Sequence, residues 1–186
     1  MSEIEIIAHS ERVESVLNAY RDAIAGDLPG YRNHVYRAIT YAMHFLGGHT
    51  HHRPLVDTAF AYHDIALWTD AATAYLEPSE ALAVADNEVH GWGLEPDALV
   101  AAIHWHHKIF AYTGPHAEVV EACRKADWID ASQGRIRKGI SRASIDAVEA
   151  ALPNEGFHDA LTRLARDNGG STLGGLIRVT AGIVKF

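Results

Sequence analysis

An apolar stretch with an adjacent histidine and aspartate constrains the fold more than any other feature of the sequence. The stretch LVDTAFAYHDIALWTD spans Leu55–Asp70 and carries His63 and Asp64 at its centre. A carboxylate among so much hydrocarbon is costly unless it is paired, hydrogen-bonded or bound to a metal, and the neighbouring imidazole favours a metal. Because adjacent side chains of a helix diverge by about 100°, a metal that binds both would lie near a helix end. Taken alone, the pair also fits a histidine that is hydrogen-bonded inside a helical core.

The composition is that of an acidic globular protein. Hydrophobic residues make up 48% of the 186 residues, charged residues make up 22%, and the formal net charge is −8. A chain of this length can bury a sizeable core as one domain. Binding to a nucleic-acid polymer would require a basic stripe on the protein surface, which an acidic chain does not favour. The single cysteine, Cys123, excludes an internal disulfide and fits a reducing compartment. Because we find neither a membrane-spanning apolar run nor a secretory signal, we expect a cytoplasmic protein that binds no membrane.

Helical periodicity recurs along the chain, and we find no alternating strand pattern and no hairpin turn. We therefore predict an all-α fold, a single compact bundle of roughly seven to nine helices. Gly26 and Gly30 are expected to break the chain before the second helix. The predicted helices cover 10–24, 31–46, 55–67, 78–90, 96–110 and a segment from Pro115, followed by two or three shorter helices after residue 134, with Ser141 and Asn154 as caps and glycine pairs at 169–170 and 174–175 as breaks.

The densest histidine cluster is the segment HWHHK, which starts at His104. Ile103 and Phe110 mark the buried arc of its predicted helix, and His106 falls between them at three and four residues. A buried imidazole needs a polar partner, so we expect His106 to face a functional site, with His104 or His107 at its edge. In a second interpretation, His106 hydrogen-bonds a metal ligand or the substrate without touching metal.

An ordered pattern includes the His63-Asp64 pair, a histidine before it and an aspartate after it. His34 lies at the border of the buried face of its predicted helix, and Asp127 lies in the segment KADWID. In this order His34, His63-Asp64 and Asp127 resemble the HD superfamily, all-α metal-dependent phosphohydrolases that are named after the His-Asp pair. The segment AIHWHHK also resembles the family's stretch in which an isoleucine precedes a histidine by three positions.

The resemblance implies an HD-type bundle with a metal centre. It covers about residues 31–133, and we expect residues 134–186 to form a helical extension of a single domain over 1–186. Imidazole and carboxylate ligands suit a divalent transition metal such as Mn, Fe, Co, Ni or Zn. One ion is the first hypothesis, and two ions are the second. The implied ligands are His34, His63, Asp64 and Asp127, with His90 and His106 available in the right order for a second ion.

The resemblance also implies that a metal-activated water hydrolyses a small phosphate ester, which we expect to be nucleotide-like. The bulky run Ile65–Trp68 replaces the small residue and lysine that often follow the family's His-Asp pair, and the GYP extension of the cyclic-dinucleotide phosphodiesterases is absent, so we do not expect cyclic di-GMP as substrate. The candidate catalytic residues are Asp64, with Asp70 and Asp130 as possible general acids, and the candidate substrate-binding residues are Arg37, His106, His107 and Lys108.

Two other functions stay open. Some HD-fold proteins, such as the myo-inositol oxygenase group, hold a di-iron centre and use dioxygen to cleave C–C or C–P bonds. The third hypothesis is a metal-binding sensor domain that has lost catalysis. The expected partner is a small-molecule phosphate ester, with a homodimer as one option for assembly, and neither a nucleic-acid polymer nor a membrane is expected.

Overall fold

The computed structural model describes residues 4–70 and 74–169, and in these ranges it contains helices and no strand. Eight of the described α-helices are longer than four residues, which confirms the predicted all-α bundle. The elements are α1 (Glu11–Ala19), α2 (Arg21–Ile24), η1 (Ala25–Asp27), α3 (Leu28–Phe45), η2 (Thr50–His52), α4 (Arg53–Tyr62), α5 (Ala66–Thr69), α6 (Leu76–Val89), α7 (Pro96–Trp105), α8 (Ala117–Ala131), α9 (Arg142–Ala151) and α10 (Phe157–Gly169).

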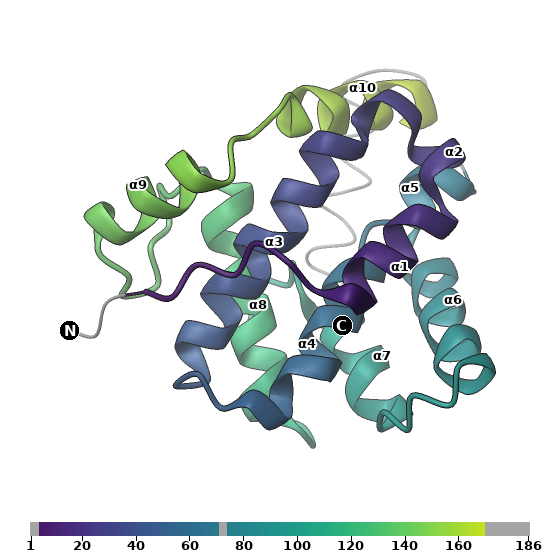
Figure 1. The fold of residues 1–186 in the computed structure, drawn as a ribbon, viewed down its shortest axis with the longest axis horizontal. Coiled ribbons are helices and arrows are strands. Elements are labelled where there is room, and N and C mark those ends of the chain that lie inside the picture. The colour runs from purple at the N-terminus through teal and green to yellow at the C-terminus, as the bar shows by residue number, and fades with distance from the viewer. Residues whose placement is uncertain (1–3, 71–73, 170–186) are drawn as a thin grey trace.

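Helix α3 runs through the middle of the bundle (Figure 1). It packs most extensively against α8, and it also contacts α4, α9 and α10. Helix α7 packs against α4, α6 and α8, so α3 and α7 are joined through α4 and α8, which both of them contact. None of the described helices combines the length and the apolarity that a membrane span requires.

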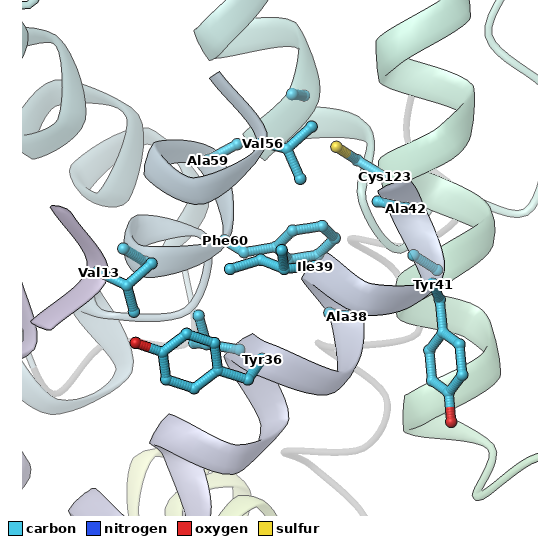
Figure 2. Close-up of a cluster of buried hydrophobic side chains, with 14 of the residues drawn as sticks. Val13, Tyr36, Ala38, Ile39, Tyr41, Ala42, Val56, Ala59, Phe60 and Cys123 are labelled. Carbon is cyan, nitrogen blue, oxygen red and sulfur yellow. The ribbon is translucent and has the colours of Figure 1, made fainter. Parts of the chain in front are cut away.

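The core surrounds α3, in which every residue from His34 to Met43 is buried. Its predicted buried row Val35, Ile39, Ala42 and Leu46 is almost fully excluded from solvent. Figure 2 shows Ile39 and Ala42 among side chains from neighbouring helices, including Phe60 of α4 and the free thiol of Cys123 of α8. Close packing of this kind holds the helices in one arrangement and so fixes the positions of the polar residues between them.

Gly30 lies inside a helix, where we predicted a break. Helix α3 begins at Leu28 with Pro29 in its first turn, a position that tolerates proline. A Cβ atom at Gly30 would lie 2.8 Å from the carbonyl oxygen of Glu155 and 3.0 Å from the backbone nitrogen of Phe157. The glycine therefore permits a close approach between α3 and the chain just before α10.

Two predicted helices end earlier than periodicity indicates. The helix predicted over 55–67 is divided by a turn at 63–65 into α4 and α5. The helix predicted over 96–110 starts at Pro96 as expected but ends at Trp105. Phe110 is consequently 52% exposed, so its assignment to the buried arc was wrong. At both early ends a histidine ring bonds a helix carbonyl.

Of the two helix caps predicted after residue 134, one is confirmed. The hydroxyl of Ser141 accepts a hydrogen bond from the backbone N–H of Ser144 at 3.0 Å, as expected of an N-cap. Asn154 does not cap α10, because that helix begins at Phe157 and the Asn154 amide contacts the ring of His158 instead. The glycine pair at 174–175 lies outside the described residues.

Candidate metal centre

Two histidines occupy equivalent positions at the ends of α4 and α7. His63 follows the last residue of α4 and donates a hydrogen bond from Nδ1 to the Phe60 carbonyl at 2.7 Å. His106 follows the last residue of α7 and donates from Nδ1 to the Ile103 carbonyl at 2.6 Å. Each ring nitrogen takes a carbonyl that the next helical turn would have used. Because a carbonyl only accepts, the neutral ring carries its proton on Nδ1 and keeps a lone pair on Nε2.

His34 reaches the same tautomer from the middle of α3. Its Nδ1 donates to Oδ2 of Asp130 at 2.6 Å, and Arg37 binds the same carboxylate through Nε and through Nη2 at 2.9 Å. A carboxylate that holds the far nitrogen of a histidine fixes the ring and raises its basicity, as is usual for metal ligands. His34 is 1% exposed, which is deeper than the border position we predicted.

The Nε2 atoms converge on two carboxylates. The Nε2 atoms of His34 and His63 lie 2.9 Å apart, and Oδ2 of Asp64 lies 3.3 Å from Nε2 of His63. The other Asp64 oxygen lies 3.5 Å from Nε2 of His106. Oδ1 of Asp127, on α8, lies 3.8 Å from Nε2 of His34 and 3.9 Å from that of His63. The structure thus brings together all four residues first predicted as ligands, with His106 beside them.

Two overlapping groups can hold a metal ion. One contains His34, His63 and Asp127, and the other contains His63, Asp64 and His106. Within each group the ligand atoms lie within 4.8 Å of one another, and every member is buried. Unprotonated imidazole nitrogens and carboxylates are the ligands that borderline divalent metals prefer.

The protonation of the centre supports this fit. Burial lowers the pKa of His34 to about 4, against the opposing effect of Asp130, so its ring is neutral at pH 7. Burial raises the pKa of Asp127 to about 7. Burial also acts to raise the pKa of Asp64, but the neighbouring His63 and His106, when protonated, outweigh it and hold that pKa well below its usual range. The Asp64 carboxylate is thus stabilised by positive charge on the side of these two imidazoles, and a bound cation would supply that charge when their Nε2 atoms are unprotonated.

His107 and Tyr75 border the centre beside His106. Nδ1 of His107 lies 2.9 Å from Nε2 of His106 and 3.1 Å from the Tyr75 hydroxyl. Nε2 of His107 is buried and has no hydrogen-bond partner among the described residues. A buried polar atom of this kind calls for a ligand, a water or an ion. Sequence reasoning missed Tyr75, because it precedes α6 outside any periodic pattern.

Asp130 and Arg37 have structural roles instead of the predicted ones. Burial acts to raise the pKa of Asp130, but the hydrogen bonds from His34 and Arg37 prevail and place that pKa well below its usual range. A carboxyl that stays ionised is a poor general acid. Arg37 is 2% exposed, and besides Asp130 it binds the Leu152 carbonyl through Nη1 at 2.9 Å. Its guanidinium is buried and already binds these two groups inside the protein, so the predicted contact with substrate is not supported.

Other predicted residues are not brought into either group. Asp70 is exposed at the end of α5. His90 is exposed at the end of α6, where its ring stacks on Trp92 with centroids 4.9 Å apart. His104 contacts Glu80 at 2.8 Å. Lys108 is 4% exposed, and burial lowers its pKa while nearby acidic residues oppose that shift.

Comparisons of the chain with protein-family models, with curated proteins and with solved structures gave no significant match. The functional conclusion therefore depends on the residues of the centre themselves.

Proposed function

We propose that the protein is a metal-dependent phosphohydrolase of the HD type that acts on a small, nucleotide-like phosphate ester. The observation that carries the proposal is the convergence of three histidine Nε2 atoms, each ring held through Nδ1, on the carboxylates of Asp64 and Asp127. When bound, a divalent metal supplies a water of lowered pKa and polarises a phosphoryl oxygen.

Different residues of the centre bind the metal, orient a ligand and contact the substrate. His34, His63, Asp64 and Asp127 hold the metal, and Asp130 orients the His34 ring through Nδ1. The burial of these side chains excludes bulk water and so strengthens the electrostatic interactions within the centre. The unpartnered Nε2 of His107 is our candidate for contact with the substrate or with the attacking water.

A screen for metal-dependent hydrolysis tests the proposal. The purified protein would be stripped of metal, reloaded separately with Mn, Fe, Co, Ni or Zn, and offered nucleoside monophosphates, cyclic nucleotides and nitrophenyl mono- and diesters. We expect release of phosphate or alcohol that EDTA abolishes and that Asp64→Ala does not show. A metal-loaded protein that hydrolyses none of these esters would contradict the proposal.

A second candidate function is favoured by the overlap of the two ligand groups, which share His63 and place His106 on the far side of Asp64. Two adjacent ions would suit a di-iron oxygenase that cleaves a C–C or C–P bond. The same preparation tests this alternative, because two irons per chain together with substrate-dependent oxygen consumption would favour it over hydrolysis. Tight metal binding with neither reaction would indicate a sensor domain.

A further inference from the structure

The segment 152–157, which precedes and begins α10, lies directly against the predicted metal ligand His34. The ring of Phe157, the first residue of α10, stacks on the ring of His34 with centroids 4.1 Å apart and planes 14° from parallel. Phe157 is 1% exposed, so the stack is sealed from solvent. The centroid of the Phe157 ring also lies 6.2 Å from that of the Tyr31 ring.

Polar contacts fasten the same segment to α3. The Asn33 amide donates to the Pro153 carbonyl at 2.8 Å, and Nη1 of Arg37 donates to the Leu152 carbonyl at 2.9 Å. Gly30 leaves room for the backbone at Glu155. Positions 30, 33, 34 and 37 follow helical spacing and share one face of α3, so residues 152–157 cover the face that carries His34.

Arg37 links this cover to the hydrogen bond that orients the histidine. Its guanidinium binds the Leu152 carbonyl on one side and the Asp130 carboxylate on the other, while Asp130 accepts from Nδ1 of His34. The His34 ring is thus restrained twice, on its face by Phe157 and at its edge by Asp130. Restraint of both kinds keeps Nε2 directed at the centre.

We infer that Phe157 is a positioning residue for the metal centre, and that the segment 152–157 is a part of that centre. The inference rests on the metal site of the proposed function, but not on the reaction catalysed there. Stacking limits rotation of the His34 ring, so the ligand is preorganised before the ion arrives. Loss of the flat ring at position 157 should weaken metal binding and change the coordination geometry, even where the helix remains folded.

The test compares Phe157→Leu with Leu161→Ala. Leucine keeps apolar bulk but does not stack, whereas Leu161→Ala removes a partly buried contact of the same helix with the core. Cobalt affinity, the visible absorption of bound Co²⁺ and the unfolding midpoint of the metal-free protein would be measured for each. We expect about a tenfold loss of Co²⁺ affinity with an altered absorption band in Phe157→Leu, and affinity within about twofold of wild type in Leu161→Ala.

A third variant, Asn33→Ala, guards against a folding defect at the buried position. It removes the tie to Pro153 at an exposed edge, and we expect a smaller loss of Co²⁺ affinity, about threefold. Wild-type affinity and absorption in both Phe157→Leu and Asn33→Ala would overturn the inference, as would an equal loss in Leu161→Ala. A wild-type protein that binds Co²⁺ but hydrolyses no ester would refute only the phosphohydrolase. A wild-type protein that binds no Co²⁺ would refute both.

Discussion

The ends of α4 and α7 have nearly the same backbone and different chemistry. His63 has φ −52° and ψ −34°, and His106 has φ −51° and ψ −35°. Both rings donate from Nδ1 to the carbonyl three residues earlier and direct Nε2 at the centre. The next residue distinguishes them, because Asp64 follows His63 whereas His107 follows His106.

This difference shows that the orientation of the imidazole and the charge at each helix end are set by different residues. The shared turn orients each imidazole, and the residue after it decides what the helix end contributes. Asp64 places carboxylate oxygens within 3.9 Å of the Nε2 atoms of His34, His63 and His106. His107 adds no carboxylate and leaves its own Nε2 without a partner among the described residues. We therefore expect the end of α4 to bind the metal and the end of α7 to complete the centre on the side of the substrate.

Removing the charge at the end of α4 should have the largest effect. Asp64→Asn keeps the size of the side chain but removes the charge that offsets the metal. We expect metal affinity to fall by more than the roughly 100-fold seen when only partners of ligands are lost. Metal content after dialysis measures the change, with Asp70→Asn at an exposed position as the matched control. Full retention of metal by Asp64→Asn would remove Asp64 from the ligands.

The two capping histidines should differ in rank. His63 belongs to both ligand groups, whereas His106 belongs to one. His63→Gln should therefore weaken metal binding more than His106→Gln, with a gap of about tenfold or more. Titration of the two variants with the same metal gives the comparison. Equal losses would show that the two helix ends are interchangeable, and a larger loss in His106→Gln would reverse the predicted rank.

His107 should affect the substrate and not the metal. Its Nδ1 contacts His106 and Tyr75, and its Nε2 is left for an incoming group. In His107→Ala we expect roughly a tenfold lower kcat/KM with unchanged metal content, the effect of one lost hydrogen bond to a charged group. The neighbouring His104→Ala serves as control, because His104 bonds Glu80. Loss of metal in His107→Ala would make it a ligand and remove the contrast with Asp64.

Stability should show the smallest effect. An ion that binds only the folded protein adds about 2.7 kcal/mol at a concentration 100-fold above its Kd. For a chain of this size that corresponds to a rise of several degrees in the unfolding midpoint, about 5–10 °C. Thermal unfolding with and without EDTA measures the shift, which Asp64→Asn should abolish. A shift of equal size in Asp64→Asn would mean that the stabilising ion binds elsewhere.

Much of the fold follows from local patterns in the sequence. The buried row of α3, the start of α7 at Pro96 and the Ser141 cap depend on neighbours within a few residues, so periodicity and capping rules predict them. The ends of α4 and α7 do not, because a ring nitrogen of His63 or His106 replaces a backbone donor there. Periodicity carries no information on that exchange.

The site was predictable only in part for a similar reason. The order of His34, His63-Asp64 and Asp127 indicated residues that the structure brings together. The pairing of Arg37 with Asp130 joins residues 93 positions apart, so the predicted substrate-binding residue Arg37 and the predicted general acid Asp130 instead support His34. Phe157, from the part of the chain that the resemblance does not cover, is a contact that only the folded protein reveals.

The most direct test of the metal centre is anomalous diffraction from crystals of the full chain grown with Co²⁺, recorded at the cobalt absorption edge. We predict the strongest anomalous peak between Nε2 of His34, Nε2 of His63 and the carboxylates of Asp64 and Asp127. A strongest peak at the histidines of the segment 49–52, outside the centre, or Co²⁺-grown crystals without a peak at the centre, would contradict the assignment.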